Sequence, residues 1–259
     1  MVLLFTIHAL NYFSALLHIL LGILILKRNK SNHISQLLAG TFFGLGVYQF
    51  FDGLIITVQI DFPGWLDLIR DLSTITLILS AEFAFLAILI VMFGEQKVFN
   101  RINFIWWPLL NIIVLYLGIT GDHIIRAGPN KNNGFHLDIA RSLMGWITIT
   151  GTLVILSTIT IIIFLIQIHK SRGKFRSKTF YFIFGYALII LNILIFDLAV
   201  FIELLNSLIA NNVFFHVNIH FFLITGEILV ISTLISPLRS DYSHINFKIE
   251  KKSMLTPEI

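Results

Sequence analysis

Long apolar runs, separated by short polar connections, follow one another along almost the whole chain. Seven of these runs hold about 17 or more mostly apolar residues, which is long enough for an α-helix to cross a bilayer. The seven predicted helices are Val2–Leu26, Ile34–Val58, Trp65–Phe93, Phe104–Thr120, Ser142–Ile168, Thr179–Leu205 and Val213–Leu238. The pattern predicts an all-α integral membrane protein, with a seven-transmembrane-helix bundle over residues 1–239 and a short polar tail over residues 240–259.

Composition excludes an ordinary soluble domain. Hydrophobic residues make up 57% of the chain and charged residues 12%, about half the charge of a typical soluble protein. The first apolar run begins at the second residue, without the basic segment and small-residue cleavage pattern of a signal peptide, so we expect it to stay as a membrane helix. The chain contains no cysteine, which excludes disulfides and thiolate metal sites.

The basic residues are unevenly divided between the two ends of the predicted helices. Fourteen of the 18 lysines and arginines follow the first, third, fifth and seventh helices, as in "HKSRGKFRSK" at residues 169–178. The other four are Arg70, Arg126, Lys131 and Arg141. Because loops rich in Lys and Arg stay in the cytoplasm, this division predicts an outside N-terminus, a cytoplasmic C-terminus and a multi-pass position in the cell membrane. The same loops are expected to contact anionic membrane lipid, whereas a nucleic-acid partner is not expected.

Ionisable residues recur inside these apolar runs, where each is costly to insert and therefore a candidate for function. At about 1.5 Å per residue they fall into two layers. The outer layer is predicted to line a ligand pocket and consists of His8, Asn11, Asp52, Asp71, Asp197, His216 and His220. The middle layer consists of His18, Glu82 and Glu227. It is predicted to couple the outer pocket to the rest of the bundle or to sense protons. One possibility for this layer is a pairing of His18 with Glu82 or Glu227, which could respond to pH or bind a polar ligand.

The last apolar run, "FFHVNIHFFLITGE", carries His216, His220 and Glu227 on one helical stripe. Two histidines four residues apart can share a metal ion, and a carboxylate from another helix could complete a zinc site. The other interpretations are a polar ligand pocket or hydrogen bonds that only join helices. A retinal Schiff base needs a lysine within a helix, and no predicted helix interior contains one.

Several local patterns resemble one family of membrane sensors. "ILKRNKSNHISQLLAGTFFGLGVYQF" is a basic turn followed by a helix with small residues, and "EFAFLAILIVMFG" is a Phe-rich helix end. "GITGDHII" leads into a long outer loop, and "GKFRSKTFYFIFGYALIILNILIF" places Gly185 and Asn192 after an Arg-led helix start. From about Leu17 to Leu238, the chain resembles the seven-transmembrane N-terminal sensor region of bacterial and archaeal membrane histidine kinases, without the kinase.

The resemblance implies a receptor-like sensor rather than an enzyme. Such a protein would bind a small or lipophilic ligand in the outer half of the bundle and would signal through a cytoplasmic partner at the basic loops. The first alternative is a metal-dependent membrane hydrolase that uses His216 and His220. The second is a transporter that moves protons or a cation past Glu82 and Glu227, although the sequence shows no inverted repeat.

Overall fold

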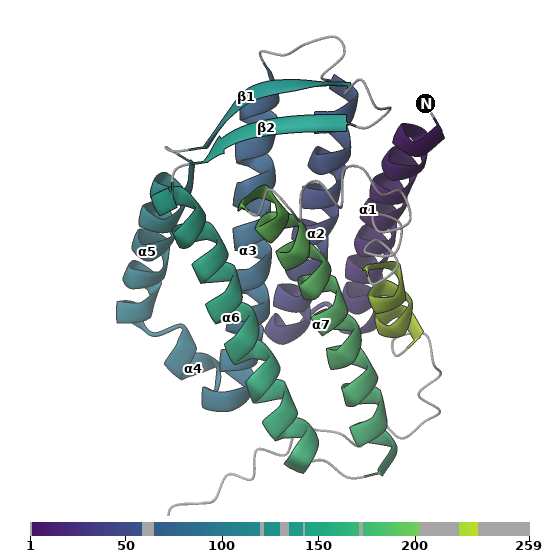
Figure 1. Cartoon of the computed structure of the whole chain (residues 1–259). Coiled ribbons are helices and arrows are strands. Elements are labelled where there is room, and N and C mark those ends of the chain that lie inside the picture. Colours follow the sequence, from purple (N-terminus) through teal and green to yellow (C-terminus); the bar gives the residue numbers. More distant parts are fainter. Residues whose placement is uncertain are drawn as a thin grey trace, which may run out of the picture.

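A computed structural model shows a bundle of helices with a small β-hairpin at one end (Figure 1). It describes residues 2–58, 65–119, 122–129, 135–141, 143–170, 173–201 and 223–232. The named elements are α1 (Val2–Arg28), α2 (His33–Val58), α3 (Leu66–Phe93), α4 (Glu95–Val98), α5 (Arg101–Ile119), β1 (Asp122–Pro129), β2 (Phe135–Arg141), α6 (Leu143–Lys170) and α7 (Gly173–Phe201). A further helix, Leu223–Ser232, follows and is called the last helix below.

Helical structure lies within each of the seven predicted stretches. Four helical segments are long and apolar enough to cross a membrane, namely Ala9–Arg28, His33–Ile55, Leu66–Phe93 and Ile147–Ile166. Three shorter apolar helical segments accompany them, Ile105–Ile119, Phe180–Ile195 and Leu223–Ser232. These lengths and compositions are those of a helical membrane protein.

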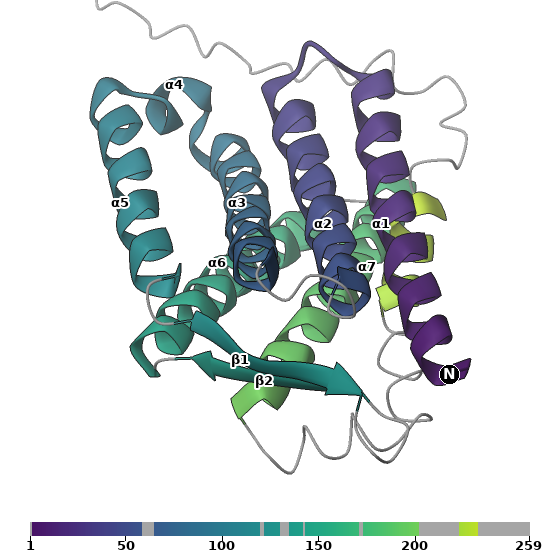
Figure 2. The ribbon, with the colours of Figure 1, turned by 90° about the horizontal axis from the view of Figure 1, so that it is seen from above.

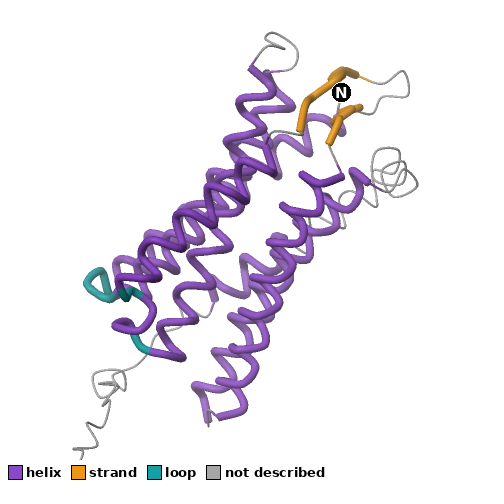
Figure 3. The backbone as a smooth tube through the Cα atoms, turned by 90° about the vertical axis from the view of Figure 1, so that its left-hand side faces the viewer, coloured by secondary structure: helices purple, strands orange, loops and turns teal. Residues whose placement is uncertain are grey.

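The connection between α5 and α6 differs from the expected irregular loop. Its described parts, β1 and β2, pair as antiparallel strands, from Asp122 opposite Arg141 to Pro129 opposite Phe135. Pro129 is the last residue of β1. Figure 3 shows the two strands at the same end of the molecule as the N-terminus. The short helix α4 and the turn between α1 and α2 lie at the opposite end (Figure 1).

Helix α2 lies between α1 and α3 and contacts both along its length (Figure 2). Small residues allow this close approach, as is usual where membrane helices pack on one another. A methyl group added to Gly44 would lie 2.8 Å from Cβ of Ser80 on α3, and one added to Gly46 would lie 3.1 Å from the Ala15 carbonyl oxygen on α1. One face of α2 thus packs closely on α3 at Gly44, and another packs closely on α1 at Gly46.

Polar residues of α1 face the interior of the bundle, and apolar ones face outward. Asn11, Ser14 and His18 are buried, whereas Phe13 and Leu16 on the other side are exposed. This arrangement is the one expected of a helix that keeps its polar groups away from lipid. Asn11 and His18, which belong to the two predicted layers, therefore share this inward face with Ser14.

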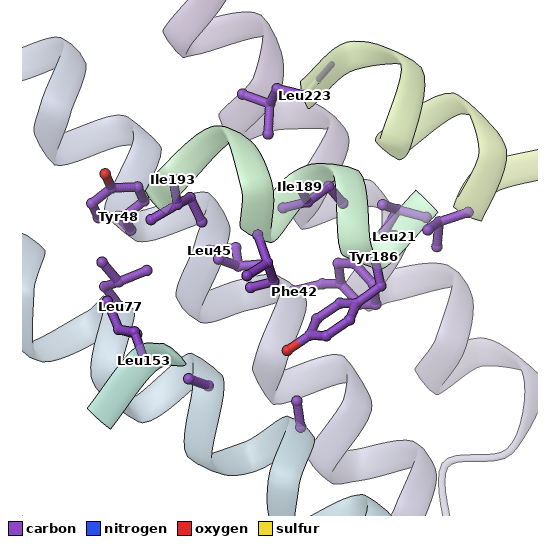
Figure 4. Close-up of a cluster of buried hydrophobic side chains, with 14 of the residues drawn as sticks. Leu21, Phe42, Leu45, Tyr48, Leu77, Leu153, Tyr186, Ile189, Ile193 and Leu223 are labelled. Atoms are coloured by element: carbon purple, nitrogen blue, oxygen red, sulfur yellow. The ribbon is translucent and has the colours of Figure 1, made fainter. Parts of the chain in front are cut away.

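A cluster of buried apolar side chains joins α2 and α3 to α6 and α7. Figure 4 shows Phe42 and Leu45 of α2 close to Tyr186 and Ile189 of α7, with Leu223 of the last helix nearby. The ring of Phe42 also lies edge-on to Phe182, with centroids 6.3 Å apart. This cluster lies beside the polar groups described next, because Phe42 also contacts His18.

Candidate functional site

A histidine and a glutamate meet inside the bundle, where neither side chain is exposed. Nδ1 of His18 on α1 lies 3.0 Å from Oε1 of Glu227 on the last helix, and both side chains are 0% exposed. The pairing of His18 with a carboxylate of the middle layer is therefore present, and its partner is Glu227. Because a buried charge is costly unless it is paired, this contact accounts for the presence of two ionisable groups in an apolar region.

Ser14 completes the group from one helical turn before His18. Its hydroxyl donates a hydrogen bond to Oε1 of Glu227, and its carbonyl oxygen lies 3.0 Å from Nδ1 of His18. Nδ1 thus faces two acceptors, the Ser14 carbonyl and the Glu227 carboxylate, so the tautomer that satisfies them carries its hydrogen on Nδ1. We call Ser14, His18 and Glu227 the buried triad.

Two atoms of the buried triad have no hydrogen-bond partner within the described part of the chain. They are Nε2 of His18 and Oε2 of Glu227, both fully buried. With its hydrogen on Nδ1, a neutral imidazole offers a lone pair at Nε2, and a carboxylate oxygen is also an acceptor. What both atoms lack is a donor, so the triad is suited to bind a hydrogen-bond donor such as water.

The geometry differs from that of a hydrolytic Ser–His–acid triad. In such a triad the acid binds one ring nitrogen and the serine hydroxyl binds the other, so that the histidine can take the serine proton. Here Glu227 and Ser14 both approach Nδ1, the hydroxyl oxygen at 3.3 Å. The Ser14 hydroxyl also gives its hydrogen to Glu227 rather than to His18. The arrangement joins α1 to the last helix and does not place His18 to activate the Ser14 hydroxyl as a nucleophile.

Close packing from two sides sets the position of the triad. Gly46 of α2 packs on α1 at this level, where an added methyl group would lie 3.4 Å from Cβ of His18. The His18 ring stacks on Phe42 at a centroid distance of 6.1 Å and an interplanar angle of 27°. On the other side, Gly226 precedes Glu227 and crosses α7 against Gly185. The crossing brings the last helix to the depth of the triad.

A second polar group lies nearer the hairpin end, between α2 and α3. The Ser73 hydroxyl donates to Oδ1 of Asp52 at 3.0 Å, and Nη1 of Arg70 lies 3.8 Å from the same oxygen. Arg70 is 15% and Asp52 25% exposed, so this group is partly shielded from its surroundings. Asp52 belongs to the predicted outer layer, and its carboxylate contacts a hydroxyl and a guanidinium in the structure.

The other predicted site residues lie outside the buried triad and the Asp52 group. Asn11 is buried on α1, Asp71 is partly exposed on α3, and Glu82 is 6% exposed on α3. Glu82 makes no hydrogen bond or ion pair with the described residues, so it does not join the His18–Glu227 contact. The side chains of His8 and Asp197, and the whole of His216 and His220, lie outside the described residues.

Within the described ranges, no group of three His, Asp or Glu side chains could hold a metal ion. The zinc site predicted at His216 and His220 is not tested by this finding, because the described ranges do not include those histidines. Zinc at that position therefore stays a prediction.

Three participants in these sites, Ser14, Arg70 and Ser73, were not among the predicted site residues. Ser14 could have been recognised from its position four residues before His18, which places both on one face of a helix. Ser73 has no comparable signal, because its partner Asp52 is on another helix, 21 residues earlier in the chain.

Comparisons with protein-family models, with curated proteins and with solved structures find no match to this chain.

Proposed function

We propose that the chain is a multi-pass membrane sensor in which the buried triad couples the outer half of the bundle to its cytoplasmic end. The observation that carries the proposal is the His18–Glu227 contact, which joins α1 to the last helix at 3.0 Å with both side chains fully buried. A change in the protonation of this pair alters a charge that the apolar surroundings cannot screen, so it favours a different packing of the two helices.

The proposed topology has seven spans, an outside N-terminus and a cytoplasmic C-terminus. Support comes from the exposed basic residues Lys27, Arg28, Lys30 and Lys97, which lie at the end of α1, in the turn after it and in α4. The turns at this end of the bundle are opposite the hairpin (Figure 1). Those turns would face the cytoplasm under the positive-inside rule. They would also offer a surface to a signalling partner.

The ligand of the proposed sensor is a small or lipophilic molecule that reaches the outer half of the bundle. The Asp52–Arg70–Ser73 group supports this choice, because it presents a carboxylate, a guanidinium and a hydroxyl near the hairpin end. Such a mixture of polar groups in a mostly apolar surrounding is typical of small-molecule sites. Helix α3 also contacts β1, so the hairpin lies close to this group.

The absence of native cysteine allows a direct test with spin labels. Lys27→Cys and Ser232→Cys place labels at exposed positions beyond the triad, on α1 and on the last helix. We expect the distance distribution between the labels to change between neutral and acidic pH in the otherwise unaltered protein. The change should be lost in Glu227→Gln and kept in Asp67→Asn, which removes an exposed carboxylate elsewhere.

An unchanged distance distribution at every pH, and with amphiphilic ligands added, would show that the triad only holds the helices together. Elemental analysis of the same preparation addresses the hydrolase alternative. About one zinc ion per chain, lost in His216→Ala/His220→Ala, would favour that alternative over the sensor.

A further inference from the structure

A cavity of about 380 Å³ lies at the α4 end of the bundle, remote from both polar groups described above. Its lining comes from the start of α2, the middle of α3 and the region of α4. The lining residues are His33, Gln36, Leu37, Gly40, Phe83, Glu95 and Phe99. Its volume falls at the lower end of the range for small-molecule pockets.

Two turns stabilised by asparagines form the surroundings of the cavity. In the first, Oδ1 of Asn32 accepts a hydrogen bond from the backbone N–H of Ile34 at 2.8 Å, which caps the start of α2. In the second, the Asn103 side chain donates to the carbonyl oxygens of Lys97 and Val98 and so closes α4. Gly94, with φ of 82°, allows the chain to turn from α3 into α4.

A histidine–glutamate contact joins the two turns at the mouth of the cavity. Nδ1 of His33, the first residue of α2, lies 2.6 Å from Oε1 of Glu95, the first residue of α4. Each side chain is 51% exposed, so both remain open to a ligand that approaches from the membrane surface. The pair uses one oxygen of Glu95, and a carboxylate can accept further hydrogen bonds.

The lining of the cavity combines polar and apolar side chains. His33 and Glu95 are at the mouth, and Gly40 lies seven residues further along α2, roughly 10 Å along the helix axis. Leu37, Phe83 and Phe99 supply the apolar wall. A cavity that begins where α2 begins and continues among apolar side chains matches a molecule with a polar head and a hydrocarbon chain.

The charges at this end select among such molecules. Lys30 and Lys97 are exposed and lie three residues before His33 and two residues after Glu95 in the chain, so they would attract a phosphate to this end of the bundle. Glu95 would repel a purely anionic head group but would accept hydrogen bonds from an ammonium group. A head group with both a phosphate and a primary ammonium satisfies the two requirements together, whereas a quaternary ammonium has no N–H to donate.

We propose that this cavity binds one phospholipid whose head group carries a primary amine, with the ammonium on Glu95 and the first part of one acyl chain against Leu37, Phe83 and Phe99. The volume suits a head group and part of one chain rather than a whole lipid. This inference does not depend on the proposed sensor function, because it uses neither the buried triad nor the Asp52 group.

Native mass spectrometry of the full chain, released from detergent after incubation with defined lipids, tests the proposal. The three lipids are phosphatidylethanolamine, phosphatidylcholine and phosphatidylglycerol with identical acyl chains. We expect the unaltered protein to retain phosphatidylethanolamine in preference to the other two. Glu95→Gln should reduce its retention by roughly two- to five-fold, the range that corresponds to a partly exposed ion pair, and should leave phosphatidylglycerol unchanged or increased.

Two further variants separate a specific site from general lipid adhesion. Asp67→Asn removes an exposed carboxylate at the start of α3 and should retain lipid as the unaltered protein does. Leu37→Trp fills the cavity and should lower retention of all three lipids, while circular dichroism and the melting temperature confirm that the variant is folded. Equal retention of the three lipids by the unaltered protein, or a preference that survives Glu95→Gln, would overturn the proposal.

Discussion

Gly185 of α7 and Gly226 of the last helix pack so closely that neither position has room for a side chain. A methyl group added to Gly185 would lie 2.6 Å from the carbonyl oxygen of Gly226, and one added to Gly226 would lie 2.5 Å from that of Gly185. The two backbones therefore touch directly, as glycines permit in membrane helices. Because Glu227 follows Gly226, the same contact brings the carboxylate to its depth in the bundle.

Replacing either glycine by alanine should separate these helices. We expect Gly226→Ala to lower the free energy of unfolding by about 1–3 kcal/mol, because the methyl group meets backbone atoms that cannot rotate away. Unfolding of the purified protein in mixed micelles, followed by circular dichroism, measures the change. Gly151→Ala is the matched control, because nothing lies within 4 Å of the added methyl group and alanine favours a helix. Equal effects of the two substitutions would refute the close crossing.

The His18–Glu227 contact should show strong energetic coupling. Removing one partner leaves the other buried and unpaired, so we expect His18→Leu and Glu227→Leu each to cost about 3–5 kcal/mol. The double variant should cost less than the two single variants together, by about 0.5–3 kcal/mol. A double-mutant cycle of unfolding free energies measures this coupling. Additive effects would mean that the two side chains do not interact.

Conservative replacement of Glu227 should be tolerated better than truncation. In Glu227→Gln, the amide oxygen can still accept the hydrogen bonds from Ser14 and His18, whereas Glu227→Ala removes the acceptor altogether. We expect the glutamine variant to be at least about 1 kcal/mol more stable than the alanine variant. Thermal unfolding of both variants, with the unaltered protein beside them, is the measurement. Equal stability would show that Glu227 acts only by filling space.

The Asp52 group should respond differently to salt because it is partly exposed. Asp52→Asn keeps an acceptor for the Ser73 hydroxyl but loses the attraction to Arg70, which we expect to cost about 0.2–1 kcal/mol. High salt should reduce this cost, because it screens the Arg70 charge in the unaltered protein. Ser73→Ala should cost about 1 kcal/mol at low and high salt alike. Unfolding at two salt concentrations distinguishes the two effects.

Membrane orientation can be tested with single cysteines, since the chain has none of its own. Ser31→Cys lies in the exposed turn between α1 and α2, and Ala127→Cys lies in β1. With a maleimide that does not cross membranes, Ala127→Cys should be labelled in intact cells and Ser31→Cys only after permeabilisation. The reverse pattern would contradict the proposed outside N-terminus, and labelling of both in intact cells would contradict the proposed spans.

The helices were predictable because the signal for each is contained in its own residues. The predicted first helix ended at Leu26 and α1 ends at Arg28, while the predicted third helix and α3 both end at Phe93. The hairpin was not predictable in this way, because pairing of β1 with β2 depends on residues that lie apart in the chain. Helix α4 is only four residues long and has no periodic pattern to reveal it.

The middle-layer pairing was predictable only to a choice between two carboxylates. Depth alone placed Glu82 and Glu227 at similar levels, and the order of helices around the bundle decides which one meets His18. That order depends on features such as the Gly185–Gly226 crossing, whose two members are 41 positions apart in the printed sequence. The cavity beside His33 and Glu95 was not foreseen for the same reason, since its mouth joins residues 62 positions apart.

The long separation between Ser14 and Glu227 also affects how the protein is made. The two residues are 213 positions apart, and a ribosome adds about 5–20 residues per second, so roughly 10–45 s pass between their syntheses. During that time the first helix carries its serine and histidine without the carboxylate that later binds them. A nascent chain that stops before residue 227 cannot complete the contact, and quality-control factors in the membrane would meet a helix with uncovered polar groups.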